Sequence, residues 1–183
     1  MKPHWSRIAR RIRVPLGFLF AAVFLWLARP TPASIAWSLL LVLPGIALRA
    51  YASGYVKKNR ELTVTGPYAY TRNPLYLGSL SIALGFAVAA RNWWILAGIA
   101  ILFFAIYLPV IRSEEELLRG MFDNFDDYCS CVPRLLPRLT PGMRGEPGKF
   151  SAALYRKHRE YNALMGAAAI YAALLLLRLY FRR

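Results

Sequence analysis

The segment Trp93–Ile111 reads WWILAGIAILFFAIYLPVI, which is 19 consecutive residues without a charge. A helix that crosses the hydrocarbon core of a bilayer needs about 20 such residues. Four further apolar runs occupy much of the remaining chain: Val14–Ala28, Ala33–Ala52, Leu75–Ala90 and Ala163–Leu177. The pattern predicts an all-α, polytopic membrane protein with about five transmembrane helices.

The composition supports this prediction. The chain has 183 residues, of which 57% are hydrophobic, and yet it carries a formal net charge of +15. Soluble domains are about 45–50% apolar, and disordered basic segments are much less so. The combination excludes collagen-like, disulfide-scaffold and disordered classes, argues against nucleic-acid binding, and fits a protein whose basic residues face an anionic membrane surface.

The basic residues are distributed unevenly between the apolar runs. Nineteen of the 24 Lys and Arg residues precede the first run, separate the second from the third, or separate the fourth from the fifth, if Arg49 at the end of the second run is counted with the connection that follows it. Only Arg29 and Arg91 lie in the alternate connections. The positive-inside rule therefore predicts a cytoplasmic N-terminus and cytoplasmic long loops. The tryptophans near the opposite ends of the runs fit an outer aromatic belt; they are Trp26, Trp37, Trp93 and Trp94.

The C-terminal segment allows two interpretations. Five crossings place Arg178 on the outer side, so residues 163–177 either form a fifth crossing, which we favour, or lie along the membrane. The basic segment Lys149–Asn162 is expected to form an interfacial helix before it. We expect a single integral membrane domain over residues 1–183, with a motif-bearing core at 55–137 and an appended segment at 149–183. Residues 133–148 have the Gly and Pro content of a linker.

Two polar segments interrupt the apolar pattern. In the first, Gly66-Pro67 predicts a turn, Pro74 can open a helix, and Asn73 then stands at the N-cap position. Side chains able to hold a ligand are dense at this helix entrance: Tyr68, Tyr70, Arg72, Asn73 and Tyr76. A helix N-terminus also offers N–H groups and a positive dipole end to an anionic group.

The second polar segment is acidic. Glu114, Glu115 and Glu116 are three of the nine acids in the chain, and they directly follow the fourth apolar run. A solvated face of an amphipathic helix would explain them. Carboxylates beside a bilayer are costly, however, unless they pair with cations. We expect Arg72, Arg112 or a cationic ligand to supply that partner.

Together the two segments resemble the isoprenylcysteine carboxyl methyltransferase family, including its prokaryotic relatives and the related phospholipid methyltransferases. The first block is Gly66-Pro67-Tyr68 followed by Arg72-Asn73-Pro74-Leu75-Tyr76-Leu77-Gly78. The second is Glu114-Glu115-Glu116-Leu117-Leu118, then Phe122, Phe125, Tyr128, and Val132-Pro133 through Pro137. The chain departs from the family pattern at Asn73, where a His is usual, at Asp123, where a Gly is usual, and at Phe125, where a Tyr is usual. Asparagine cannot titrate, so Asn73 fits hydrogen bonding better than a role as a base.

The resemblance implies an S-adenosylmethionine-dependent methyltransferase with a cytoplasmic cofactor pocket and S-adenosylhomocysteine as product. It assigns cofactor binding to Glu61, Leu62, Tyr68, Asn73, Pro74, Leu75, Tyr76 and Glu114. Glu115 is the second choice for the glutamate that meets the cofactor. The expected catalytic set is Arg72, Arg112 and Glu115, with an arginine holding the carboxylate of the acceptor.

The acceptor is expected to be a lipophilic or lipid-modified molecule that enters from the bilayer. A carboxylate nucleophile needs no base, whereas an amine does, and this difference favours a carboxyl acceptor. Lipid amine methylation and a non-enzymatic role in membrane transport or assembly remain alternatives. No metal site is expected, because Cys129 and Cys131 have no further ligands at a suitable spacing. The oligomeric state is left open.

Overall fold

A computed structural model describes residues 3–57, 61–143 and 148–180 of the chain. Within these residues all regular structure is helical. The long helices are α1 (Pro3–Leu27), α2 (Pro32–Ser53), α3 (Pro74–Ala90), α4 (Trp93–Leu102), α5 (Leu108–Met121) and α8 (Tyr161–Tyr180). The short ones are η1 (Gly66–Ala69), η2 (Phe103–Tyr107), α6 (Phe125–Cys131) and α7 (Ala152–Lys157). The predicted all-α class is confirmed.

Three helices are long and apolar enough to cross a membrane. They are α2, the continuous helix Trp93–Met121 formed by α4, η2 and α5, and α8. The apolar helices Pro15–Leu27 and Pro74–Ala90 are shorter than 18 residues. The described part of the chain therefore contains fewer full-length spans than the five expected, because α1 becomes apolar only after Pro15 and α3 ends at Arg91.

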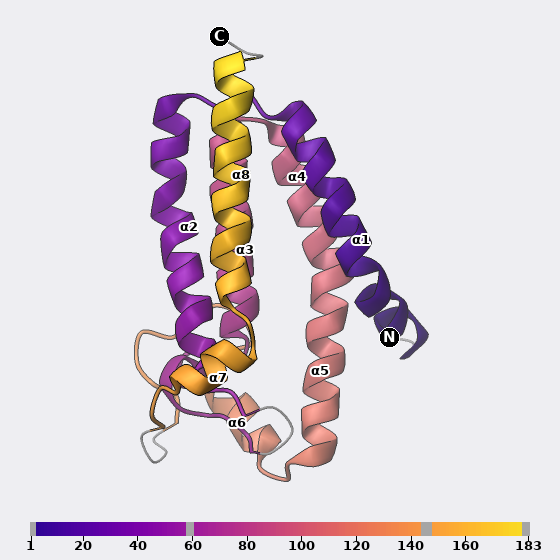
Figure 1. Ribbon diagram of the computed structural model, residues 1–183. Helices are drawn as coiled ribbons and strands as arrows, with labels where there is room; N and C mark the ends of the chain where they lie inside the picture. The colour runs from indigo at the N-terminus through magenta and orange to yellow at the C-terminus, as the bar shows by residue number, and fades with distance from the viewer. Residues whose placement is uncertain (1–2, 58–60, 144–147, 181–183) are drawn as a thin grey trace.

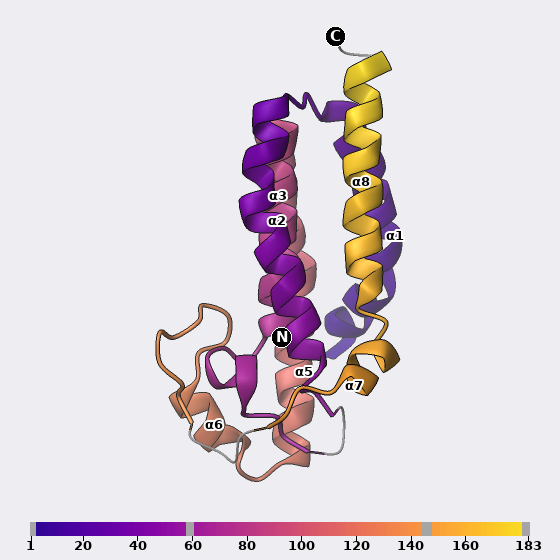
Figure 2. The ribbon, with the colours of Figure 1, turned by 60° about the vertical axis from the view of Figure 1, so that its left-hand side comes forward.

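The apolar helices lie side by side (Figures 1 and 2). The N-terminus and the long connections lie at one end of the bundle, and the C-terminus lies at the other (Figure 1). One hydrophobic cluster joins five helices through Phe24, Val42, Phe86, Ile95 and Leu174. The end of α1 and the starts of α2 and α4 meet at the end opposite the long connections, and Trp26, Trp37, Trp93 and Trp94 are all exposed there.

Helices α2 and α3 pack closely because small residues face each other. A Cβ on Gly78 would lie 2.7 Å from the carbonyl oxygen of Gly45, and a Cβ on Gly45 would lie 2.8 Å from the carbonyl oxygen of Gly78. Such contacts bring two backbones together and are a common way to join helices in membranes. This close approach sets Arg49 of α2 against the first turns of α3.

The continuous helix contains one irregular turn. The segment Phe103–Tyr107 is a π-helix, and Pro109, which has no N–H to donate to a regular helix, follows it after one residue. Tyr107 at its end lines the cavity described below. The apolar sequence of Trp93–Ile111 gave no sign of this irregularity.

The segment before α8 is less helical than expected. Within the interfacial stretch 149–162, Ala152–Lys157 forms a short α-helix of its own, and residues 161 and 162 already belong to α8. A tight turn follows, in which Arg159 adopts the left-handed conformation with φ of 53°. Of residues 133–148, for which we expected linker character, 144–147 lie outside the described residues.

We predict that Gly78→Ala lowers the thermal stability of the purified protein, because the new methyl group meets backbone atoms of α2. The expected loss in the free energy of unfolding is about 1–3 kcal/mol. Gly120→Ala is the matched control, since nothing lies within 4 Å of a Cβ at that helical glycine. Thermal unfolding in detergent should show a lower midpoint for Gly78→Ala alone; equal midpoints would contradict the close packing.

Candidate active site

A cavity of about 980 Å³ opens at the end of the bundle that carries the long connections. Polar side chains from the connections, α3 and α5 line one part of it. Residues Gly17, Phe18 and Ala21 of α1 and Gly166 and Ile170 of α8 line another part. The cavity is thus lined on one side by the polar side chains of the connections, α3 and α5, which we call the polar platform. On another side it is lined by the apolar surfaces of α1 and α8.

The entrance to α3 is held in place by a tight turn. Gly66 adopts φ of +59°, and a Cβ there would collide with the ring of Tyr55, so glycine is required at this position. The buried hydroxyl of Tyr128 donates a 2.7 Å hydrogen bond to the carbonyl oxygen of Tyr68. The turn predicted from Gly66-Pro67 is confirmed by η1.

Tyr68 of this turn and Tyr128 of α6, which bonds to it, are both buried, and burial raises the pKa of both phenols above the ordinary value. The negative charges of Glu160 and Glu114 raise the pKa of Tyr68 further, whereas Arg49 lowers it. Both phenols therefore stay protonated at neutral pH.

Glu115 is the centre of a buried network. Its residue is only 5% exposed, and both carboxylate oxygens are occupied. Oε2 accepts from Nε of Arg134 at 2.8 Å, while Oε1 accepts from Nδ2 of Asn73 at 3.1 Å and lies 3.6 Å from Nε of Arg72. One carboxylate of α5 thus fixes two residues at the entrance to α3 and one in the segment after α6.

The segment after α6 is docked against this entrance and does not behave as a free linker. The N–H of Arg72 donates to the carbonyl of Pro133, and the N–H of Gly142 donates to that of Ala69. The hydroxyl of Thr71 bonds the carbonyls of residues 134 and 135. The linker prediction for residues 133–143 is therefore wrong, because their backbone groups pair with residues 69–72.

Asn73 occupies the predicted N-cap position of α3, but its side chain makes no capping hydrogen bond. Its amide instead donates to Glu115 and to the carbonyl of Arg134 at 3.0 Å. The capping role that we expected for this side chain is wrong. The first turn of α3, from Pro74 to Tyr76, lines the cavity.

Glu114 has different surroundings from its neighbour. It accepts a 2.9 Å hydrogen bond from the hydroxyl of Tyr76 and lines the cavity. Among the residues that the structure describes, none forms an ion pair with Glu114. Successive residues of a helix point about 100° apart. This explains why the carboxylate of Glu115 pairs with Arg134, Asn73 and Arg72 while that of Glu114 faces the cavity.

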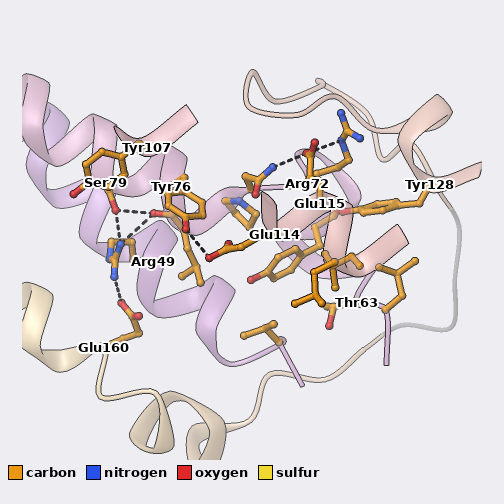
Figure 3. A pocket seen from close by; sticks show the side chains of 18 of the residues that line it. Arg49, Thr63, Arg72, Tyr76, Ser79, Tyr107, Glu114, Glu115, Tyr128 and Glu160 are labelled. Carbon is orange, nitrogen blue, oxygen red and sulfur yellow. Dashed lines mark hydrogen bonds and ion pairs between the residues drawn. The ribbon is translucent and has the colours of Figure 1, made fainter. Parts of the chain in front are cut away.

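A second polar group lies on the other side of Glu114 (Figure 3). Arg49 donates from Nη2 to Oε2 of Glu160 at 2.8 Å, and from Nη1 to the hydroxyl of Ser79 and, at 3.2 Å, to the carbonyl of Leu75. The pair is largely shielded from solvent, with side chains 23% and 11% exposed for Arg49 and Glu160. Tyr107 packs edge-on against Tyr76 nearby.

The structure brings together ten of the eleven residues that the sequence assigned to the site. Those that line the cavity are Glu61, Leu62, Tyr68, Arg72, Asn73, Pro74, Leu75, Tyr76, Glu114 and Glu115. Glu61 lies at its exposed rim, where it pairs with Lys57 at 2.9 Å. Arg112 is exposed and does not line the cavity. It precedes Glu114 by two residues, so it points to nearly the opposite face of α5.

Several lining or supporting residues were missed by the sequence analysis. Arg49 had been counted only as a basic residue at the end of a span, although a charge within an apolar run is itself a signal of function. Glu160 is the one acid beside a basic cluster of α7. The buried hydroxyl of Thr63 lines the cavity without a hydrogen-bond partner among the described residues, and no local pattern marks it.

A family model described as phospholipid methyltransferase matches residues 16–124. The chain belongs to the phospholipid methyltransferase family. This family is related to the isoprenylcysteine carboxyl methyltransferases that the motifs resemble. The match to the phospholipid methyltransferase model contains every residue that the sequence assigned to the site, whereas Tyr128, Arg134 and Glu160 lie beyond it.

Two curated relatives are similar over part of their length. The chain is 39% identical over 90 residues to the nickel-cobalt-cadmium resistance protein NccN of Alcaligenes xylosoxydans xylosoxydans, with 49% of this chain and 41% of that protein covered. It is 36% identical over 96 residues to the cobalt-zinc-cadmium resistance protein CzcN of Cupriavidus metallidurans, with coverages of 52% and 43%. The matches span less than half of either relative. No solved structure matches the chain.

We predict that Glu115→Gln destabilises the protein strongly, because it leaves the shielded guanidinium of Arg72 without its carboxylate. Breaking a buried pair costs about 3–5 kcal/mol, and we expect about 2–3 kcal/mol here because Arg134 is partly exposed. Asp126→Asn is the control, since it removes one member of the exposed pair with Arg119 outside the cavity. Unfolding midpoints in detergent should fall for Glu115→Gln and stay near wild type for Asp126→Asn. A Glu115→Gln midpoint equal to wild type would refute the network.

Proposed function

We propose that the protein transfers a methyl group from S-adenosylmethionine to a lipophilic acceptor, with a carboxylate as the favoured acceptor group. The observation that carries the proposal is the single cavity that joins a polar platform to the apolar faces of α1 and α8. Membership in a methyltransferase family supplies the reaction class. The names of the two relatives describe resistance to metals, which is a phenotype, and they do not name a reaction.

The polar platform has the groups that this cofactor requires. S-adenosylmethionine carries an ammonium, a carboxylate, an adenine and a sulfonium. Glu114 faces the cavity without an ion-pair partner among the described residues and would take the ammonium. The first turn of α3 would take the carboxylate at the positive end of its dipole. Tyr68, Tyr76 and the unpartnered hydroxyl of Thr63 supply aromatic faces and a further polar contact.

The cofactor brings a methyl group already activated by the positive sulfur, so the protein has mainly to position the two reactants. The network of Glu115 with Arg72, Asn73 and Arg134 supports this by holding the entrance to α3 rigidly. We therefore assign Glu115 and Arg72 a positioning role. Arg112 keeps no role in the proposal because it faces away from the cavity.

The acceptor is proposed to enter between α1 and α8. Gly17 and Gly166 have no side chain, and Phe18 and Ile170 offer an apolar wall for a hydrocarbon chain. A carboxylate acceptor fits the described groups best, since its oxygen bonds the methyl carbon as the carbon–sulfur bond breaks, and no proton has to leave. An amine acceptor, which the family name favours, would need a base at its nitrogen. The carboxylates of Glu115 and Glu160 are both engaged by arginines.

We further propose that the protein spans the membrane with the cavity mouth on the cytoplasmic side. The basic connections and the N-terminus gather at the end of the bundle that carries the cavity (Figure 1). The positive-inside rule places that end in the cytoplasm.

The proposal predicts that the purified protein binds S-adenosylhomocysteine, and that Glu114→Gln weakens this binding about tenfold or more by removing the charge that faces the ammonium. Calorimetry or thermal-shift titration in detergent measures both affinities. Asp126→Asn, which changes a carboxylate outside the cavity, should bind like wild type. Wild-type protein that is folded and yet binds no cofactor would refute the enzymatic function and favour a non-enzymatic membrane role. Equal affinities of wild type and Glu114→Gln would refute the placement of the cofactor.

A further inference from the structure

The chain beyond the family match contributes a wall and a charge to the cavity. Residues Glu160, Gly166 and Ile170 line it, although the family model ends at residue 124. This segment is anchored to the end of α2 at several points. The ring of Phe150 stacks on Tyr51 with centroids 6.1 Å apart, the N–H of Ser151 donates to the carbonyl of Gly54, and a ring nitrogen of His158 lies 3.1 Å from the carbonyl oxygen of Ser53.

The turn before α8 directs Glu160 into the cavity at some conformational cost. Arg159 is in the left-handed region with φ of 53°, which a residue with a side chain rarely adopts. Strained backbone of this kind persists where the surrounding structure enforces it, and it gathers at functional sites. Its effect here is to bring the adjacent Glu160 carboxylate 2.8 Å from Arg49.

Arg49 is equipped to hold a carboxylate at the apolar side of the cavity. Its Nη1 is fixed by Ser79 and by the carbonyl of Leu75, so the guanidinium has a set orientation. Its Nε is buried and has no hydrogen-bond partner in the described part of the chain. The Nη2 is bound by a carboxylate that comes from the protein itself. Figure 3 shows this group beside Tyr107 and Ser79, away from the Glu115 network.

We infer that Arg49 is the subsite for the carboxylate of a lipophilic ligand, and that Glu160 occupies this subsite as an internal substitute when the ligand is absent. The inference rests on the proposed function and names the residues of its acceptor side. A ligand carboxylate takes over the Nη2 donor as Glu160 withdraws with its turn. The hydrocarbon chain of the ligand then lies along Phe18 of α1 and Ile170 of α8.

The competition between Glu160 and the ligand sets the measurable effect. A ligand that must displace an internal carboxylate binds with an apparent affinity reduced by the fraction of protein in which Arg49 is available. Removing the charge of Glu160 should therefore tighten carboxylate binding, although it removes a salt bridge. A purely structural ion pair would give the opposite result or no effect on ligand binding.

The test measures binding of radiolabelled oleate to full-length protein in phosphatidylcholine nanodiscs by scintillation proximity. Glu160→Gln should bind oleate about fivefold to tenfold tighter than wild type. Arg49→Gln should lose the site, and Asp126→Asn should match wild type. Unlabelled oleate should displace the label from wild type, whereas oleyl alcohol and oleylamine should not. Equal oleate affinity of wild type and Glu160→Gln, retained binding by Arg49→Gln, or displacement by the alcohol or the amine would overturn the inference.

Glu160→Asp guards against a folding defect, because it keeps the charge on a side chain one methylene shorter. It should bind oleate with an affinity between those of wild type and Glu160→Gln, and an affinity equal to wild type would overturn the inference. S-adenosylhomocysteine binding by each variant is measured in parallel. Cofactor binding without the oleate pattern would overturn the subsite and leave the proposed function standing. The oleate pattern without cofactor binding in any variant would support the subsite and overturn the proposed function.

Discussion

The buried carboxylate of Glu115 is the interaction on which the rest of the site depends. It joins helix α5, the entrance to α3 and the segment after α6 in one network with Arg72, Asn73 and Arg134. A buried carboxylate is tolerated only when its oxygens are satisfied. These bonds in turn fix Pro74 and the first turn of α3, which is where the proposed cofactor site begins.

The cavity combines two electrostatic environments that are separated by Glu114 and Tyr76. On one side, Arg72 and Arg134 share the single carboxylate of Glu115. On the other side, Arg49 is shared between α3 and Glu160. Glu114 remains as the acid without an ion-pair partner in the described part of the cavity wall. Under the proposed function, Glu114 would take the cationic group of the methyl donor and Arg49 the carboxylate of the acceptor.

The helical fold and ten of the cavity-lining residues could be predicted from the sequence. Apolar runs and basic connections are local patterns, and the two polar motifs lie at span ends where tertiary contacts bring them together. The family resemblance ranked Glu114 before Glu115 at the cofactor, but the residue types alone do not separate two adjacent acids, and only the packed helix decides which one meets Arg134. Arg112 was misplaced because proximity in sequence says nothing of the helix face. Arg49 and Glu160, 111 residues apart, were missed because only the folded chain pairs them.

The central claim is that this cavity delivers the methyl group of S-adenosylmethionine to a lipophilic carboxylate. The most direct measurement incubates membranes that contain the protein with methyl-tritiated S-adenosylmethionine, extracts the lipophilic products and treats them with alkali. A methyl ester releases its label as volatile methanol, whereas an N-methyl group does not. We expect alkali-released volatile label that falls about tenfold or more with Glu114→Gln. Label that remains non-volatile after alkali treatment, in either the lipid or the aqueous fraction, would contradict the claim.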